Sequence, residues 1–92
     1  MSATASEQSM AGTAKTISLQ YPITADGVQV TKLTLRRPLV RDRLIAEKAS
    51  GSEFEKEIRF IANLCEMAPQ HIEILDMVDY AKLQECLADF LS

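Results

Sequence analysis

The first third of the chain alternates between apolar and polar residues, which is the period of a half-buried β-strand. One alternating run covers residues 16–23 and a second covers residues 28–36. Asp26-Gly27 stands between them, and this dipeptide between two such runs is a strong signal for a β-hairpin. The second run changes phase midway, so we expect a β-bulge near Thr31-Lys32 that keeps both of its halves on the core side. The pattern predicts a hairpin over residues 16–36.

From Pro38 onward the apolar residues recur every three to four positions, which is the helical period. Pro38 ends the second strand, because proline cannot donate to a strand ladder but is tolerated in the first turn of a helix. Gly51 and Pro69 interrupt the periodic segments, and Ser52 and Asp76 are suitable N-caps for the segments that follow them. The predicted helices cover about residues 39–49, 52–66, 69–75 and 77–91.

A strand pair followed by helices in one short chain is typical of the α+β class. We expect an N-terminal β-hairpin packed on a small bundle of three to four helices, because a two-stranded hairpin is not stable alone. Residues 1–15 are small and polar without any period, so a flexible tail is expected there. With 92 residues in all, residues 16–92 form a single domain.

The expected helices differ in the amount of apolar surface that they carry. The first has one stripe, which we expect to face the core: Val40, Leu44, Ile45 and Ala49. The second has a narrow core stripe that spans about 60° on a helical wheel: Phe54, Ile58, Ile61 and Cys65. The last has apolar residues over about 220°, whereas a helix that buries one face needs little more than about 100°.

Two interpretations of the wide apolar face on the last helix stay open. Either this helix is central in the bundle and covered on both sides, or it has one face for the core and a second face for another chain. In the second case the extra face serves a homo-oligomer or an amphipathic partner helix. Leu83 and Leu87 are then core residues, and the expected partner-binding residues lie outside the core stripes: Phe60, Leu64, Met77 and Leu91.

Few residues in the chain could carry chemistry. Cys65 and Cys86 lie among apolar residues at helical spacing, so we expect inert core thiols, and their spacing fits no metal motif. His71 is the one histidine and is expected to face solvent, and the three glycines are too far apart to form a phosphate-binding loop. We therefore expect no catalytic residue, no cofactor and no metal site, which makes an enzyme the least favoured class.

The most pronounced charge cluster consists of four arginines: Arg36, Arg37, Arg41 and Arg43. One interpretation is contact with phosphates, which would make the chain a small nucleic-acid-binding regulator. The other is a solvated strand end and helix face, balanced by nearby acidic residues. The net charge of −3 and the absence of aromatic residues among the arginines favour the second interpretation.

The sequence carries no signal for a membrane or for secretion. No apolar run approaches the ~18 residues of a membrane span. The N-terminus lacks the basic and apolar regions of a signal peptide, and two cysteines are too few for a disulfide framework. A cytoplasmic protein without a membrane partner is expected.

Residues 21–38 carry a series of motifs that is more specific than these properties. They read YPITADGVQVTKLTLRRP, and a second set follows at residues 64–69 and 75–80, which read LCEMAP and LDMVDY. Asp42 and residues 46–48 belong to the same series. In this order and spacing, the chain resembles the tail assembly chaperone family of contractile-tailed phages, the Mu-like and P2-like group, over about residues 17–91.

The resemblance implies a non-enzymatic phage tail assembly chaperone. Such a protein binds the tape measure protein during tail morphogenesis, acts in the cytoplasm of the bacterial host and is absent from the mature virion. The resemblance also implies a longer product made by translational frameshift. A tape measure protein is a long, largely helical chain with apolar stripes, and a small acidic domain with spare apolar helix surface could cover it. The alternative function is the nucleic-acid-binding regulator that uses the arginine cluster.

Overall fold

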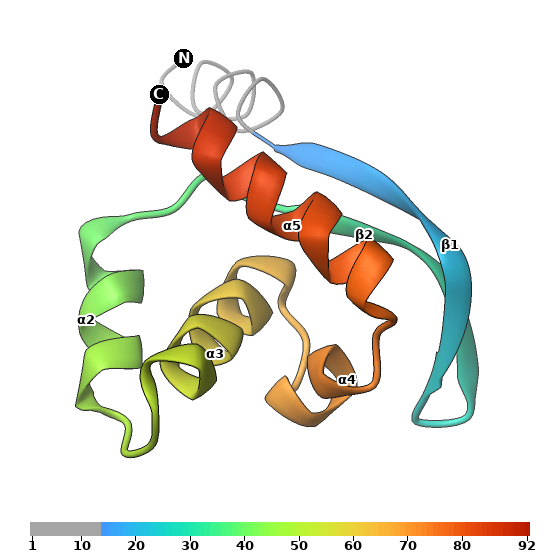
Figure 1. Cartoon of the computed structure of the whole chain (residues 1–92), viewed down its shortest axis with the longest axis horizontal. Helices are drawn as coiled ribbons and strands as arrows, with labels where there is room; N and C mark the ends of the chain where they lie inside the picture. The colour runs from blue at the N-terminus through green and yellow to red at the C-terminus, as the bar shows by residue number, and fades with distance from the viewer. Residues whose placement is uncertain (1–13) are drawn as a thin grey trace, which may run out of the picture.

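The computed structural model describes residues 14–92, which form an antiparallel β-hairpin followed by four helices (Figure 1). The strands are β1 (Lys15–Ala25) and β2 (Val28–Leu35). The helices are α2 (Val40–Lys48), α3 (Glu53–Cys65), α4 (Pro69–Glu73) and α5 (Met77–Phe90). The predicted α+β class and the predicted order of elements are confirmed.

Two of the expected boundaries need correction. Strand β1 begins at Lys15, which pairs with Leu35, although the sequence pattern assigns Lys15 to the tail. The short helix α4 ends at Glu73 and not at Leu75. The rest of the expected tail, apart from Ala14, lies outside the described residues.

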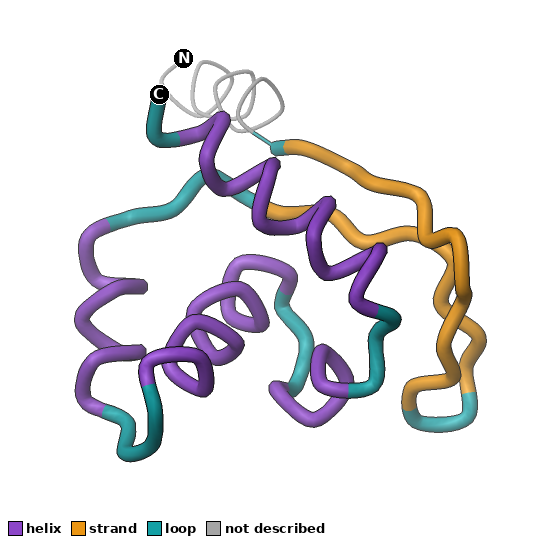
Figure 2. The backbone as a smooth tube through the Cα atoms, in the orientation of Figure 1, coloured by secondary structure: helices purple, strands orange, loops and turns teal. Residues whose placement is uncertain are grey.

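The hairpin curves round one side of the molecule, and α5 packs along β1 (Figures 1 and 2). Helix α3 packs against β2, α4 and α2, and α2 stands at the left of Figure 1, away from the turn of the hairpin. The core lies where the hairpin, α3 and α5 meet. Its fully buried apolar side chains include Leu35, Ile61, Ile72 and Leu83.

Asp26 and Gly27 form the turn of the hairpin, as predicted. Their φ angles are +51° and +80°. A two-residue turn with positive φ at both positions is of type I′, whose twist matches that of the flanking strands. Glycine adopts such a conformation without steric cost, and aspartate is one of the few other residues that tolerate it. The Asp-Gly pair therefore sets the position of the turn.

The hairpin has an irregular register halfway along its length. Residues 19–22 of β1 lie opposite Thr31 of β2 alone, so the extra residues belong to β1. The bulge expected near Thr31-Lys32 is therefore at the right level of the hairpin but on the wrong strand. Leu19, the first residue of this irregular segment, and Ile23, the residue that follows it, are both buried.

Two side chains of α5 bind this irregular segment of β1. Asp79 is 0% exposed, and its carboxylate accepts the backbone N–H groups of Gln20 at 2.8 Å and Tyr21 at 3.0 Å. Lys82 lies 3.2 Å from the same carboxylate and donates to the carbonyl oxygen of Ser18 at 2.9 Å. These contacts, which we call the α5 clamp, give partners to backbone groups at the irregular part of the ladder.

A second buried carboxylate joins β2, α2 and α3. Asp42 accepts two hydrogen bonds from the Arg36 guanidinium, at 2.7 and 2.8 Å. It also accepts the backbone N–H of Leu39 at 2.8 Å and the side-chain amide of Asn63 at 2.7 Å. The bidentate bond to Arg36 holds the pKa of the Asp42 carboxyl below its usual value. We call this set of contacts the Asp42 hub.

The expected burial of the apolar stripe on α2 is wrong, because the Asp42 hub turns a different face inward. Asp42 and Ala46 are the buried residues of α2. At about 100° per residue, Val40 and Leu44 lie on the opposite side of the helix from Asp42. Val40 is accordingly 89% exposed, and Leu44 and Ile45 are exposed as well. The inward face of α2 is thus anchored by a polar contact, and its larger apolar side chains face solvent.

Helix α3 buries a wider arc than the one expected. Ile61 is buried as predicted, and Ile58 and Cys65 are partly buried against the core, but Leu64 is buried as well and Phe54 is exposed. Leu64 lies beside the end of β2, where its carbonyl oxygen accepts the backbone N–H of Arg36 at 3.1 Å. Because α3 is packed against β2 as well as α2 and α4, its buried arc is wider than one stripe. Leu64, expected among the exposed contacts, is a core residue with 1% exposure.

Ser52 caps α3, as predicted, and its hydroxyl accepts the backbone N–H of Glu55 at 3.1 Å. The Glu55 carboxylate accepts the backbone N–H of Ser52 at 2.7 Å, which completes a capping box. We expect Ser52→Ala to lower the free energy of unfolding by about 1 kcal/mol, because one backbone donor loses its acceptor. Urea denaturation measures the change, with Ser50→Ala in the preceding loop as the control. Equal midpoints for the two variants would contradict a stabilising cap.

Candidate functional site

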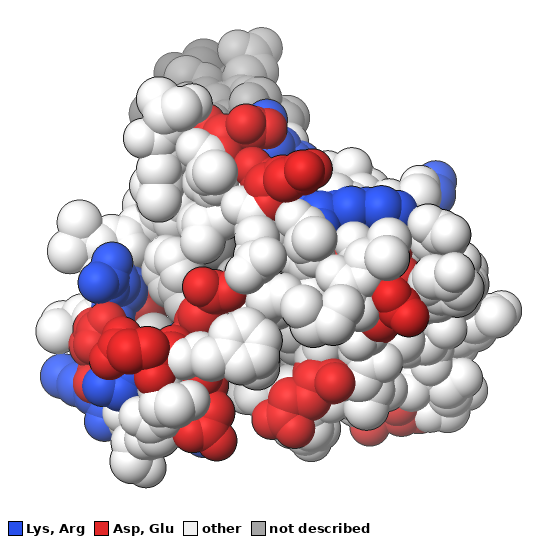
Figure 3. Space-filling view, viewed as in Figure 1, with Lys and Arg blue, Asp and Glu red and all other residues white. Residues whose placement is uncertain are grey.

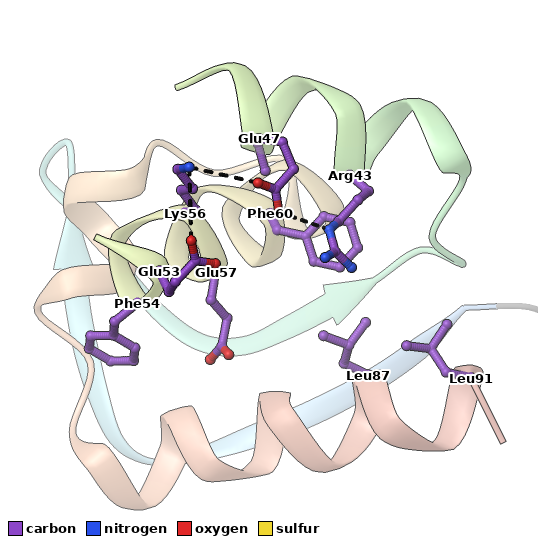
Figure 4. Close-up of a pocket in the computed structure, with 10 residues that line it drawn as sticks. Arg43, Glu47, Glu53, Phe54, Lys56, Glu57, Phe60, Leu87 and Leu91 are labelled. Carbon is purple, nitrogen blue, oxygen red and sulfur yellow. Dashed lines mark hydrogen bonds and ion pairs between the residues drawn. The ribbon is translucent and has the colours of Figure 1, made fainter. Parts of the chain in front are cut away.

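A groove of about 450 Å³ opens between α2, α3 and the C-terminal half of α5 (Figure 4). Its apolar lining comes from α3 and α5, apart from Ala46 of α2: Phe54, Phe60, Leu87 and Leu91. Its charged lining comes from α2 and α3: Arg43, Glu47, Glu53, Lys56 and Glu57. The groove therefore combines an apolar wall with a charged rim.

The apolar wall is formed by two helices that face each other. Leu87 and Leu91 project from α5 toward Phe60 on α3 (Figure 4). Phe54 lies nearer the N-terminus of α3 and meets the Tyr80 ring edge-on, with 5.6 Å between the ring centres. Phe60 follows Phe54 by six positions, so the wall extends about 9 Å along α3, somewhat less than two helical turns.

Most of the charged residues on the rim pair with one another (Figure 4). The Glu47 carboxylate lies 3.0 Å from Arg43 and 3.7 Å from Lys56, and Lys56 also lies 4.0 Å from Glu53. In the space-filling view, basic and acidic patches accordingly adjoin each other over α2 (Figure 3). These exposed pairs leave little net charge at this end of the rim.

Glu57 is the exception among these charged residues. Its Oε2 atom accepts the Tyr80 hydroxyl at 2.7 Å and the Gln84 side-chain amide at 2.9 Å. Both donors are neutral, and within residues 14–92 no lysine or arginine forms an ion pair with Glu57. Burial and the bond to Glu57 raise the pKa of Tyr80, so its hydroxyl stays a donor. A half-buried carboxylate without a cation therefore lies inside the groove.

The sequence pattern does not by itself select Glu57 for this role. Its two hydrogen-bond donors lie on α5, 23 and 27 residues further along the chain. On α3 alone, Glu57 belongs to a series of acidic residues near a helix N-terminus, where a solvated face is the ordinary interpretation. The available signal is its position between Phe54 and Phe60, the two aromatic residues of the wall.

The structure separates the four residues that the sequence indicates as partner-binding. Phe60 and Leu91 line the groove together. Leu64 is in the core, as described above, and Met77 is exposed at the opposite end of α5, outside the groove lining. Of the two residues expected in the core of this helix, Leu83 is fully buried, and Leu87 is half-buried and forms part of the apolar wall.

The cysteines and the histidine lie on three different helices, α3, α5 and α4. Burial raises the pKa of Cys65 to about 12 and also raises that of Cys86, so both thiols stay protonated at neutral pH. His71 does not face solvent as expected, because it packs near the hairpin turn with its Nε2 atom 3.6 Å from a carboxylate oxygen of Asp26. Within residues 14–92, no group of three or more His, Cys, Asp or Glu side chains is placed to hold a metal ion.

The arginine cluster is divided by acidic residues. Arg36 belongs to the Asp42 hub, and Arg43 pairs with Glu47 one helical turn away. Two of the four arginines are thus neutralised within the chain, which leaves Arg37 and Arg41 for contact with a phosphate. No helix in the described part of the chain has the length and apolar character needed to cross a membrane.

Comparison with known proteins bears on the family of the chain. A family model described as "Phage tail assembly chaperone proteins, E, or 41 or 14" matches residues 16–92. Neither the curated proteins nor the solved structures gave a match. The matched range covers the hairpin from its second residue, all four helices and every residue that lines the groove. The chain therefore belongs to the family of phage tail assembly chaperone proteins.

Proposed function

We propose that this chaperone is not an enzyme and that it binds the tape measure protein of its phage during tail morphogenesis. The observation that carries the proposal is the apolar surface left exposed on α2, on α3 and at both ends of α5. Its large side chains are Leu39, Val40, Leu44, Ile45, Phe54, Met77, Val78 and Leu91. Apolar surface of this kind on a small protein marks sites of association with another chain.

A tape measure protein fits this surface because, as the family resemblance implies, it is long, largely helical and striped with apolar residues. An amphipathic helix lays its apolar face into a hydrophobic groove. Binding to the unassembled chain would favour the covered state over aggregation by mass action. In this proposal the chaperone acts in the cytoplasm of the bacterial host and is absent from the mature virion.

Co-expression of the chaperone with the tape measure protein of the same genome tests the proposal. We expect the tape measure protein to co-purify with the tagged chaperone and to precipitate when it is expressed without it. The tail tube protein, expressed in the same way, is the control, because it also belongs to the tail. Recovery of the tube protein in place of the tape measure protein would contradict the proposed partner.

The purified protein also allows two related questions to be answered. Its mass in solution shows whether free chains self-associate, and the mass of the product expressed from the phage gene shows whether a longer frameshifted form is made.

Binding to duplex DNA that weakens steeply between about 50 and 200 mM salt would favour the alternative function, a nucleic-acid-binding regulator.

A further inference from the structure

We propose that the groove between α2, α3 and α5 binds one amphipathic helical segment of the tape measure protein. The apolar residues of the segment pack against Phe60, Leu87 and Leu91, and a lysine or arginine of the segment pairs with Glu57. This inference rests on the proposed function, to which it adds the binding site and the chemistry of the segment.

The dimensions of the groove suit one face of a single helix. The apolar wall is about 9 Å long, which corresponds to between one and two turns of a partner helix. A helix laid along it presents anchors at positions i and i+3 or i+4, part of the spacing used in helix-in-groove recognition. Two of the three facing residues, Leu87 and Leu91, are themselves one helical turn apart on α5.

Glu57 determines the charge that the segment must carry. Its carboxylate is half-buried and, among residues 14–92, is bonded only to the neutral groups of Tyr80 and Gln84. The nearest basic residue in the sequence, Lys56, is directed to Glu47 and Glu53 on the rim. A cation on the incoming helix would therefore supply the missing opposite charge, and the aromatic wall would limit its screening by water.

A second copy of this chain matches that charge less well. The helices that supply the large apolar side chains of the groove, α3 and α5, each carry more acidic than basic residues. The residues in α3 are Glu53, Glu55 and Glu57 against Lys56 and Arg59, and those in α5 are Asp79, Glu85 and Asp89 against Lys82. Either helix of a second copy would bring further negative charge toward Glu57. Compared with these two helices, a basic segment of a separate protein is the better match.

Leu91→Ser and Met77→Ser form a matched pair that tests the position of the site. The two side chains lie at opposite ends of α5, Met77 as its first residue and Leu91 as its C-cap, and Leu91 and Met77 are 70% and 65% exposed, so neither change should affect stability. Only Leu91 lines the groove. We expect the affinity for the tape measure protein, measured by biolayer interferometry, to fall at least about tenfold for Leu91→Ser and to change less than about twofold for Met77→Ser. Equal losses would overturn the assignment to the groove.

Glu57→Gln tests the charge of the segment. The glutamine oxygen can still accept from Tyr80 and Gln84, so the fold should be kept, and a thermal melt checks this. Glu85→Gln, exposed on α5 and outside the groove, is the control. We expect Glu57→Gln to weaken binding about tenfold and to reduce its dependence on salt, whereas the control binds like the wild-type chain.

Overlapping peptides of the tape measure protein, each 20 residues long by design, then identify the segment. Replacing its lysine or arginine by alanine should weaken binding to the wild-type chain and have little further effect on Glu57→Gln, as in a double-mutant cycle. Additive effects of the two changes would overturn the pairing with Glu57.

The outcomes separate the inference from the proposed function. If the wild-type chain binds the tape measure protein and all groove variants bind equally well, the groove assignment is wrong and the function stands. If the wild-type chain does not bind, both are overturned. If the groove variants change only the mass of the free chain, measured by light scattering, the occupant is a second copy and the inference is wrong.

Discussion

Asp79→Asn should unfold the protein or lower its melting temperature by at least about 10 °C. The single side-chain oxygen of asparagine can accept the N–H group of Gln20 or that of Tyr21, but not both in the present geometry. The asparagine NH2 group then faces the remaining backbone N–H group, which is also a donor. In addition, Lys82 loses its ion pair. Lys82 is partly exposed and can be hydrated, so the main cost, about 3 kcal/mol, comes from the buried backbone donor that loses its acceptor and faces an amide N–H. In a domain of this size, about 1 kcal/mol shifts the melting temperature by about 4–8 °C. Circular dichroism during a thermal scan measures the change.

Asp89→Asn is the matched control for this prediction. Asp89 lies on the same helix and is exposed, and within the described residues its side chain forms only a long contact of 3.8 Å with Lys15. Exposed pairs contribute little, so this variant should stay within about 0.5 kcal/mol of the wild-type chain. If Asp79→Asn melts at the same temperature as Asp89→Asn, the α5 clamp does not stabilise the fold.

The pH dependence of stability gives a second measurement on the same group. Burial alone would raise the pKa of the Asp79 carboxyl, but the bonds from Gln20, Tyr21 and Lys82 bring this pKa below its ordinary value of about 3.9. Since the pKa is lower in the folded state, the stabilisation is complete above about pH 4 and is lost as the pH falls through the folded value. The wild-type chain should therefore lose stability in acid, and Asp79→Asn should lose less over the same range.

Asp42→Ala should lower the free energy of unfolding by about 2–3 kcal/mol and should loosen α2 more than any other helix. It removes the acceptor of Arg36, Leu39 and Asn63 at once. Arg36 remains partly exposed and can be hydrated, so the cost is smaller than for a fully buried pair. Urea denaturation measures the stability, and hydrogen exchange measures the opening of individual helices.

Glu47→Ala on the same helix is the control for stability, because it removes only the exposed pairs with Arg43 and Lys56. With so little apolar contact holding its inward face, α2 should exchange its amide hydrogens faster in Asp42→Ala, while α5 keeps its protection. Unchanged exchange in α2 would show that Ala46 and the rest of its packing hold the helix without the hub.

The features that could be predicted from the sequence are those set by neighbouring residues. The Asp26-Gly27 turn and the Ser52 cap depend on a few consecutive positions, and both were found where the pattern predicts them. The strand that carries the bulge and the buried face of α2 could not be predicted, because they depend on Asp79 and Asp42. A buried carboxylate cannot be recognised in a sequence when its donors come from distant segments.

In the candidate site, too, local patterns could be predicted and contacts between distant segments could not. Phe60 and Leu91 could be selected because they lie outside the core stripes of their own helices, and both line the groove. Leu64 was selected by the same rule but lies in the core, because β2 packs on a second side of α3. The apolar pattern of α3 alone does not show this contact. Glu57 could not be selected, because its environment is formed by α5.

The α5 clamp also determines when the hairpin can be completed during synthesis. Gln20 and Asp79 are 59 residues apart in the chain. At about 5–20 residues per second, the ribosome adds Asp79 roughly 3–12 s after Gln20. The two strands can meet earlier at their turn, but the middle of β1 lacks its partners during this interval. The first strand therefore reaches its final register only with the last helix, so folding is completed after translation of α5 and not progressively from the N-terminus.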